Sequence, residues 1–330
     1  MYWLARRVIL AFSTLLAVLI IGFMLLRLMP GNPIQAYINS QLAQGVPPDI
    51  AYSRAKTLYA IYPQKPLWEQ FFDYIRSVFH GNFGQSFQYQ GRPAIDIVLS
   101  ALPWTVFTLS IAITIQFIVG ILIGMLIAYR RGTKIDSVVT VMLMAWRAIP
   151  DYVIGIIILI VFAVQLKLFP YYGEYSAGVT PGFNLEFFKD VLWHATLPIL
   201  TYVIVGFPGW ALAMRGSTIG VLGEDYVAAA EARGLPGRRI AITYVGKNAI
   251  LPLFTSFVIT LGYMFGGSNF IEWLFTYRGI GYFFIMSTWA RDYAVVQACL
   301  FIEVLAIIVG VTLADLLYGL IDPRVRVSGR

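Results

Sequence analysis

Long apolar runs separated by polar segments dominate the pattern along this chain. Each run is long enough to cross, as a helix, the roughly 30 Å hydrocarbon core of a bilayer. The runs are Val8–Met29, Leu102–Tyr129, Ser137–Leu166, Ala195–Met214, Ala249–Ile271 and Ala294–Leu320. We therefore expect an all-α polytopic membrane protein with six transmembrane helices. Prolines and glycines interrupt the run Ala195–Met214, and we expect it to kink or break near Gly206–Gly209.

A proline-rich stretch, residues 31–100, follows the first apolar run. Within it, apolar side chains recur at helical spacing at Leu67, Phe71, Tyr74 and Val78. Charged residues lie between them. This predicts an amphipathic helix that lies at the outer membrane interface or caps the bundle. The chain thus divides into an N-terminal transmembrane helix (1–30), an extracytoplasmic cap (31–100), a five-helix core (101–320) and a cytoplasmic tail (321–330).

Composition supports the membrane assignment. The chain is 59% hydrophobic and 12% charged, whereas ordinary soluble domains have about 45–50% and about 25%. Its single cysteine, Cys299, excludes a disulfide framework and a cysteine-based metal cluster. The net charge of +7 fits basic cytoplasmic loops, and no nucleic-acid-binding motif is recognisable.

The distribution of basic residues predicts the orientation. With the amino terminus inside, the inner segments hold Arg6, Arg7, Arg130, Arg131, Lys134, Arg215, Arg233, Arg238, Arg239, Lys247, Arg324, Arg326 and Arg330. Cytoplasmic loops of membrane proteins carry an excess of Lys and Arg. We therefore expect a multi-pass protein of the cell (inner or plasma) membrane with both termini in the cytoplasm.

The longest polar interruption in the second half runs from Glu224 to Pro252. It opens with acidic residues, has Arg233 further on, and is stopped by Gly234 and then Pro236. Negative charge at the start, positive charge at the end and glycine just beyond are typical of a short helix. Tyr226, Ala229, Ala230 and Arg233 then share one face, which is made mostly of small side chains. An ordinary surface turn between two spans remains an alternative.

Residues 228–234 (AAAEARG) resemble the cytoplasmic EAA motif of ABC-transporter permeases, with Ala228 at the glutamate position. Further fragments resemble the dipeptide/oligopeptide branch of that family in the same order. They are PGNP (30–33) for PGDP, GNFG (81–84) for GDLG, YRGIG (277–281) for WPGLG, RDYAVVQ (291–297) for RDYPVVQ, and DLLYGLIDPR (315–324) for DLLYG…DPR. The chain resembles the B-type permease subunit of such importers.

The resemblance implies a type I ABC permease fold in which residues 224–234 form the coupling helix. It places ATPase docking on Glu224, Asp225, Tyr226, Ala229, Ala230, Glu231, Arg233, Gly234, Arg238 and Arg239. It implies a second homologous permease subunit, two ATP-binding subunits and an extracytoplasmic substrate-binding protein as partners, with alternating access as the mechanism. Dipeptides, longer peptides, nickel complexes and oligosaccharides all remain open as substrates.

The sequence predicts no catalysis and no cofactor in this chain. A Walker A loop needs upstream glycine and a terminal hydroxyl residue, and Gly246-Lys247-Asn248 has neither. The two histidines, His80 and His194, lie in different segments outside any zinc-hydrolase motif.

Ionisable residues inside apolar runs are candidates for function. Arg147 and Asp151 are four residues apart, so they can pair on one helix face. With Glu303 and Asp315 in the last run, they are candidates for lining the substrate pathway. A structural ion pair and interface contacts are the simpler interpretation of the same residues.

Two other functional classes remain open. A stand-alone ion-coupled transporter or channel would need no ATPase and would depend on Asp151, Glu303 or Asp315. A membrane scaffold without transport would need no cytoplasmic docking motif.

Overall fold

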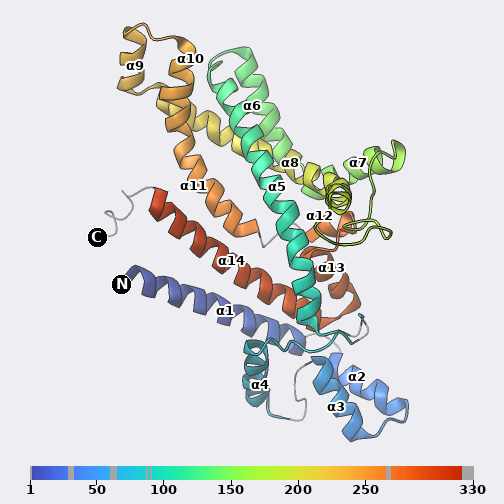
Figure 1. Cartoon of the computed structure of the whole chain (residues 1–330). Helices are drawn as coiled ribbons and strands as arrows, with labels where there is room; N and C mark the ends of the chain where they lie inside the picture. The colour runs from blue at the N-terminus through green and yellow to red at the C-terminus, as the bar shows by residue number, and fades with distance from the viewer. Residues whose placement is uncertain are drawn as a thin grey trace. The chain divides into compact units, whose positions relative to one another are not determined.

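The computed structural model describes residues 2–28, 33–59, 65–86, 88–89, 91–264 and 269–321. These residues form helices joined by turns, from α1 (Tyr2–Leu28) to α14 (Tyr293–Ile321), and no strand occurs among them. The expected all-α class is confirmed (Figure 1). The chain forms two compact units, unit 1 (residues 2–105 and 269–309) and unit 2 (residues 106–264 and 310–321, as far as described).

Unit 1 contains a large hydrophobic core and a smaller cluster formed by α2 (Pro33–Ala43) and α3 (Pro48–Tyr59). Its elements are α1, α2, α3, α4 (Leu67–Phe79), the start of α5 (Ala94–Ala128), α12 (Asn269–Leu274), α13 (Ile280–Ala290) and the first half of α14. Leu19 and Phe23 of α1 meet Tyr74 and Val78 of α4 in this core. The Phe23 and Phe71 rings contact edge to face at 5.3 Å. The predicted amphipathic helix is therefore present as α4 and packs against α1.

The two helices α2 and α3 lie between α1 and α4 in the sequence. They were not predicted, because their mixed composition gives no clear apolar stripe. Ile34 and Ile38 of α2 pack with Ala51 and Ala55 of α3 and with Tyr293 at the start of α14. The small alanines allow the two helices to approach closely.

Unit 2 contains the remainder of α5, α6 (Lys134–Arg147), α7 (Asp151–Ile158), η1 (Leu159–Gln165), α8 (Leu185–Leu222), α9 (Asp225–Ala232), α10 (Gly237–Arg239), η2 (Ile240–Gly246), α11 (Lys247–Tyr263) and the end of α14. Glycine allows its helices to cross tightly. A Cβ at Gly120 of α5 would lie 2.9 Å from the Phe207 carbonyl oxygen of α8. A Cβ at Gly262 of α11 would lie 2.7 Å from the Gly310 carbonyl carbon of α14.

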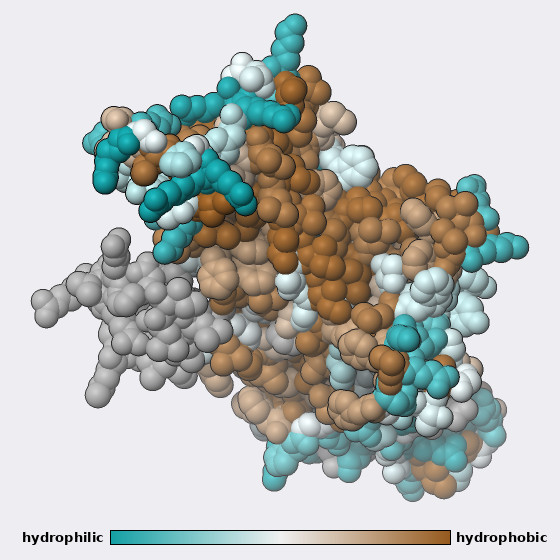
Figure 2. Space-filling view, turned by 45° about the horizontal axis from the view of Figure 1, so that its top comes forward, coloured by the Kyte–Doolittle hydropathy of each residue, from teal (hydrophilic) through white to brown (hydrophobic). Residues whose placement is uncertain are grey.

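Among the described residues, 4 helices are long and apolar enough to span a membrane, or up to 5 when a bent pair counts as one span. They are α5, α8, the continuous α10–η2–α11 and α14, with α6 and α7–η1 as the bent pair. Within α1, residues Ile9–Met24 form a further apolar helical stretch, shorter than these spans. Figure 2 shows broad hydrophobic surface, in brown, bounded by hydrophilic patches, in teal. Such a surface suits contact with lipid.

Three helix predictions differ from the structure in detail. The run Ser137–Leu166 is not one straight helix, because α6 and α7–η1 are bent by 94° at a break before Asp151. Pro150 accounts for this break, because a proline disfavours the helical conformation of the residue that precedes it. In contrast, α8 runs unbroken through Pro198, Pro208 and the expected break at Gly206–Gly209. The predicted span Ala249–Ile271 also ends early, with α11 at Tyr263, and Ile271 belongs to α12.

Candidate functional site

The polar segment after α8 forms a short helix with a well-defined end. This helix, α9, covers Asp225–Ala232, with Glu224 before it and Arg233 after it. Gly234 adopts φ +70, donates its N–H to the Glu231 carbonyl at 2.9 Å, and Leu235 donates to the Ala230 carbonyl at 3.3 Å. These two bonds form a Schellman motif, which satisfies carbonyls that the helix end would otherwise leave unpaired.

The faces of α9 differ from the face that the sequence predicted. Val227 and Ala230 are buried and pack with Ile240 and Val245 of η2. Ala230 is therefore part of the segment's own core, whereas the sequence placed it on the docking face. The other predicted docking residues are exposed: Glu224, Asp225, Tyr226, Ala229, Glu231, Arg233, Gly234, Arg238 and Arg239. Only this outer side of α9 is open to a partner.

The basic residues after α9 lie on a second short helix. Pro236 starts α10, and Arg238 and Arg239 are its last residues. The chain then continues without interruption through the π-helix η2 into α11. Figure 1 shows α9 and α10 at the end of unit 2 where the turn between α5 and α6 also lies. Hydrophilic side chains, in teal, cover this end in Figure 2.

The turn between α5 and α6 carries charge interactions with its surroundings. Partial burial and the negative charge of Glu231 raise the pKa of Tyr129, which directly follows α5. Tyr129 and α9 are therefore near enough to interact. No pattern in the sequence indicates this proximity, because Tyr129 and Glu231 are far apart along the chain.

An ion pair joins α6 to α8 next to this turn. The Arg215 guanidinium donates to both carboxylate oxygens of Asp136, at 2.6 Å and 2.9 Å. Asp136 also accepts the Gly132 N–H at 3.1 Å, while the Thr133 side chain caps α6. Two-pronged geometry of this kind is the strong form of a salt bridge. Asp136 was missed because a lone acid at the start of an apolar run resembles any solvated helix start.

The four candidate pathway residues belong to three different helices. Arg147 ends α6 and Asp151 begins α7, so the 94° bend separates residues that were expected to share one helix. The Arg147 guanidinium lies against Gly209 of α8, where a Cβ would be 3.9 Å from it. Glu303 is buried within unit 1. Asp315 lies in α14 beyond the side chains that the structure describes.

Sequence reasoning missed two buried acids of unit 1. Glu272 of α12 is 2% exposed and accepts the Gly281 N–H at the start of α13 at 2.8 Å. Asp292, which precedes α14, accepts the Ser86 hydroxyl and the Gln88 N–H. Both carboxylates hold turns in place. The turn-rich fragments YRGIG and RDYAVVQ around them were the available signal.

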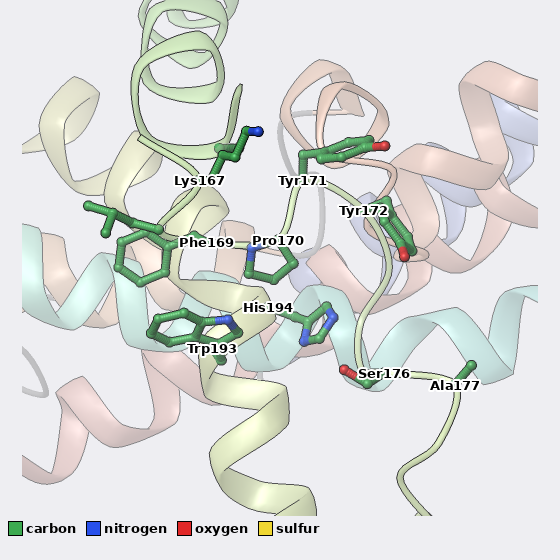
Figure 3. Close-up of a pocket in the computed structure, with 11 residues that line it drawn as sticks. Lys167, Phe169, Pro170, Tyr171, Tyr172, Ser176, Ala177, Trp193 and His194 are labelled. Atoms are coloured by element: carbon green, nitrogen blue, oxygen red, sulfur yellow. The ribbon is translucent and has the colours of Figure 1, made fainter. Parts of the chain in front are cut away.

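A cavity of about 440 Å³ lies where η1, the following loop and the first turns of α8 meet. Phe169, Pro170, Tyr171 and Tyr172 of the loop and Trp193 of α8 form apolar walls. Figure 3 shows Trp193 below Phe169, His194 below Tyr172, and Lys167 and Tyr171 at the upper edge. The Phe169 and Trp193 ring centroids are 4.6 Å apart. The sequence did not single out this loop.

Hydrogen bonds fix the polar side of this cavity. The Asp190 carboxylate accepts the Ser176 N–H at 2.6 Å and the Ser176 hydroxyl at 2.9 Å. His194, which is 7% exposed, has Nδ1 2.9 Å from the Asp190 carbonyl oxygen. Because a carbonyl oxygen only accepts, Nδ1 carries a proton, and in the neutral form of the ring Nε2 is then an acceptor. Lys167 has φ 51, a left-handed conformation uncommon for residues other than glycine.

Metal ligation has no support in the described ranges. Within them, no group of three or more His, Cys, Asp or Glu is arranged to hold a metal ion.

Comparison with known proteins gives a consistent result over nearly the whole chain. The family model described as "Binding-protein-dependent transport system inner membrane component" matches residues 120–327. The chain is 28% identical to the oligopeptide transport system permease protein AppB of Bacillus subtilis (strain 168), over 98% of both chains. It is 32% identical to a putative peptide permease protein of Brucella suis biovar 1 (strain 1330), again over 98% of both. It is 28% identical to the dipeptide transport system permease protein DppB of Escherichia coli (strain K12), over 98% of both.

Proposed function

This chain belongs to the family of binding-protein-dependent transport system inner-membrane components, and from that premise we propose that it is the permease subunit of an ATP-driven peptide importer. It forms half of the translocation pathway, together with a second homologous permease subunit. Two ATP-binding subunits supply the energy, and an extracytoplasmic binding protein delivers the substrate. The peptide class follows from relatives of both the oligopeptide and dipeptide systems.

The observation that carries this proposal is the exposed side of α9. It combines acids at the helix start, small side chains in the middle and Arg233 at the end, on a helix whose inner side is fixed by Val227 and Ala230. A helix of eight residues is marginal alone. Packing against η2 holds α9 in place, so that its exposed side can bind in a groove on a partner subunit.

The length of α8 supports opposite locations for α9 and the aromatic cavity. With 38 residues and 1.5 Å per residue, α8 is about 57 Å long. That exceeds the roughly 40–45 Å of a bilayer with its headgroups. Since α9 follows the end of α8 and Trp193 lies near its start, a cytoplasmic α9 implies an extracytoplasmic cavity.

ATP hydrolysis belongs to the partners in this proposal. The sequence Gly246-Lys247-Asn248 lies at the junction of η2 and α11, inside a continuous helix. A phosphate-binding loop instead needs backbone N–H groups turned toward the ligand. Helical N–H groups are already bonded to carbonyls of the preceding turn, so this segment is unsuited to hold a nucleotide.

Alternating access gives the structural elements their roles. Closure of the ATP-binding subunits moves α9, which is joined to α8 directly and to η2 through their shared core. The bidentate Asp136–Arg215 pair then carries a displacement of α8 to α6. Arg147 at the α6–α7 bend is our first candidate for a pathway residue, because it is an exposed cation inside an apolar run.

The decisive experiment is purification of the chain from its native host in mild detergent, with mass spectrometry of the proteins that remain bound. We expect two ATP-binding subunits and a second permease. A parallel purification of the chain with residues 225–233 replaced by a Gly/Ser linker serves as the control and should lose the ATP-binding subunits. A stable, transport-active chain without any ATPase would overturn the proposal in favour of an ion-coupled transporter.

A further inference from the structure

We propose that the aromatic cavity between η1, its loop and α8 is a subsite for the C-terminal residue of a peptide, selective for a large apolar or aromatic side chain. The inference rests on the proposed function and adds a substrate preference to it. It assigns the walls to the terminal side chain, Lys167 to the terminal carboxylate and His194 to the terminal amide.

The walls suit one large side chain. The volume of about 440 Å³ lies at the small end of ligand pockets, which are about 300–1,000 Å³. The Phe169 and Trp193 rings, 4.6 Å apart and tilted by 39°, form one side of the cavity, and Pro170 and Tyr172 lie around it (Figure 3). An aromatic side chain gains both buried apolar area and ring contacts there.

The polar groups complement the end of a peptide chain. Lys167 lies on the cavity edge as an exposed cation, and an ammonium is a strong donor to a carboxylate. With Nδ1 donating to the Asp190 carbonyl, the neutral form of His194 presents Nε2 as an acceptor. A C-terminal residue carries an acceptor carboxylate and a donor amide N–H within one residue. An internal residue carries no charge to match Lys167.

The cavity is formed before any ligand arrives. Two hydrogen bonds from Ser176 to Asp190 tie the loop to α8, and the bond from His194 to the Asp190 carbonyl fixes the imidazole ring. The left-handed Lys167 redirects the chain at the end of η1. Strained residues persist where surrounding structure holds them, often at binding sites. A preformed pocket costs less ordering on binding.

A peptide fits these features better than a docking protein. The cavity accommodates a single residue, and its only charged lining group is Lys167. A protein surface would bring an internal side chain, and the backbone of an internal residue carries no charge to match Lys167. Binding-protein docking remains a distinct outcome of the test below.

The test measures uptake of three labelled tripeptides by cells that contain the complete transporter: Gly-Gly-Phe, Gly-Gly-Phe-amide and Gly-Gly-Gly. We expect Lys167→Met and Trp193→Ala to raise the KM for Gly-Gly-Phe about tenfold, the effect of losing one charge-assisted hydrogen bond or one packed ring. Trp193→Ala should not change the KM for Gly-Gly-Gly, which has no side chain to lose contact, and Lys167→Met should not change the KM for Gly-Gly-Phe-amide, which has no terminal carboxylate. Lys167→Arg should retain the preference. Lys189→Met is the matched control, because it removes the same charge from an exposed position on α8 outside the cavity.

A second measurement is independent of transport rate and of small losses in folding. A peptide that ends in benzoylphenylalanine is photolysed with the purified complex, and the crosslinked residues are mapped. Crosslinks to Trp193 or Phe169 that Gly-Gly-Phe competes away support the subsite. Equal loss of uptake for all three peptides would assign the cavity to docking and overturn the subsite, as would unchanged KM values without crosslinks. Absence of uptake of every peptide by the unmodified transporter would instead overturn the proposed function itself.

Discussion

Three buried carboxylates among the described residues hold turns in place. Glu272 binds the first N–H groups of α13, Asp292 binds the turn before α5, and Asp136 binds the turn before α6. Backbone N–H groups and a guanidinium supply the partners that a buried charge requires. The Glu272 site is the tightest, because Gly279 and Gly281 pack directly against its carboxylate.

We predict that Gly281→Ala destabilises unit 1. The added Cβ would lie 2.5 Å from the Asn269 Cα and 2.8 Å from its Oδ1, closer than any ordinary contact. Such overpacking costs about 1–3 kcal/mol. The measurement is the melting temperature of the detergent-purified chain. Gly216→Ala is the control, because a Cβ there meets no atom within 4 Å and alanine favours a helix. Equal melting temperatures for both variants would contradict the close contact.

In the short helices α4 and α9, different faces of one helix have different surroundings. On α4, Tyr74 and Val78 face the core, Trp68, Phe72 and Phe79 form an exposed apolar stripe, and Glu69, Asp73 and Arg76 occupy the remaining arc. A helix with one face on protein, one apolar face outward and one polar face suits the membrane interface. On α9 the inner side fixes the helix and the outer side stays available.

The end of α9 supports a prediction about coupling. Gly234 has φ +70 with open space around it, so substitution is limited by backbone conformation, not by a clash. Valine disfavours the left-handed region by roughly 1–2 kcal/mol or more, whereas asparagine tolerates it. We expect Gly234→Val to lower peptide uptake about tenfold while ATP hydrolysis by the complex persists. Gly234→Asn should retain most uptake.

The measurement is uptake and ATPase activity of the same reconstituted complex. Full uptake in Gly234→Val would show that the helix stop has no part in coupling. Parallel loss in the valine and asparagine variants would assign the effect to side-chain volume at the docking surface.

At the scale of the whole molecule, the basic segments and the long helices together define the sidedness that we propose. Arg233, Arg238 and Arg239 follow α8, and the loop around Lys167 precedes it. Because α8 is longer than a bilayer is thick, the two loops belong on opposite sides. The excess of Lys and Arg after α8 assigns that side to the cytoplasm.

Cysteine labelling tests this sidedness. We expect Phe183→Cys to react with a membrane-impermeant maleimide on intact cells, and Arg238→Cys to react only after permeabilisation. Both positions are exposed. The native Cys299 is buried, so it should add little background. The reverse pattern would invert the topology and remove α9 from the reach of a cytoplasmic ATPase.

Several features were predictable because they depend on neighbours in the chain. The helix α4, the short helix α9 with its glycine stop, and most apolar runs follow from periodicity and local backbone chemistry. Other features depend on contacts between distant segments. Ala230 looked equivalent to Ala229 in the sequence, and only packing against Ile240 and Val245 placed it inside. The bend before Asp151 and the uninterrupted α8 likewise show that a proline can end one helix and be tolerated in another.

The amino-acid sequence alone indicated the all-α membrane class, the position of the short helix α9 and the family, because apolar run length, helix end signals and ordered short motifs are local properties. Tertiary structure alone decided which carboxylates are buried, which side of α9 is exposed and that Lys167, Phe169, Trp193 and His194 surround one cavity. The physical reason is that burial and side-chain convergence arise when segments distant in the chain pack together. No pattern along a single segment encodes the partners that it will meet.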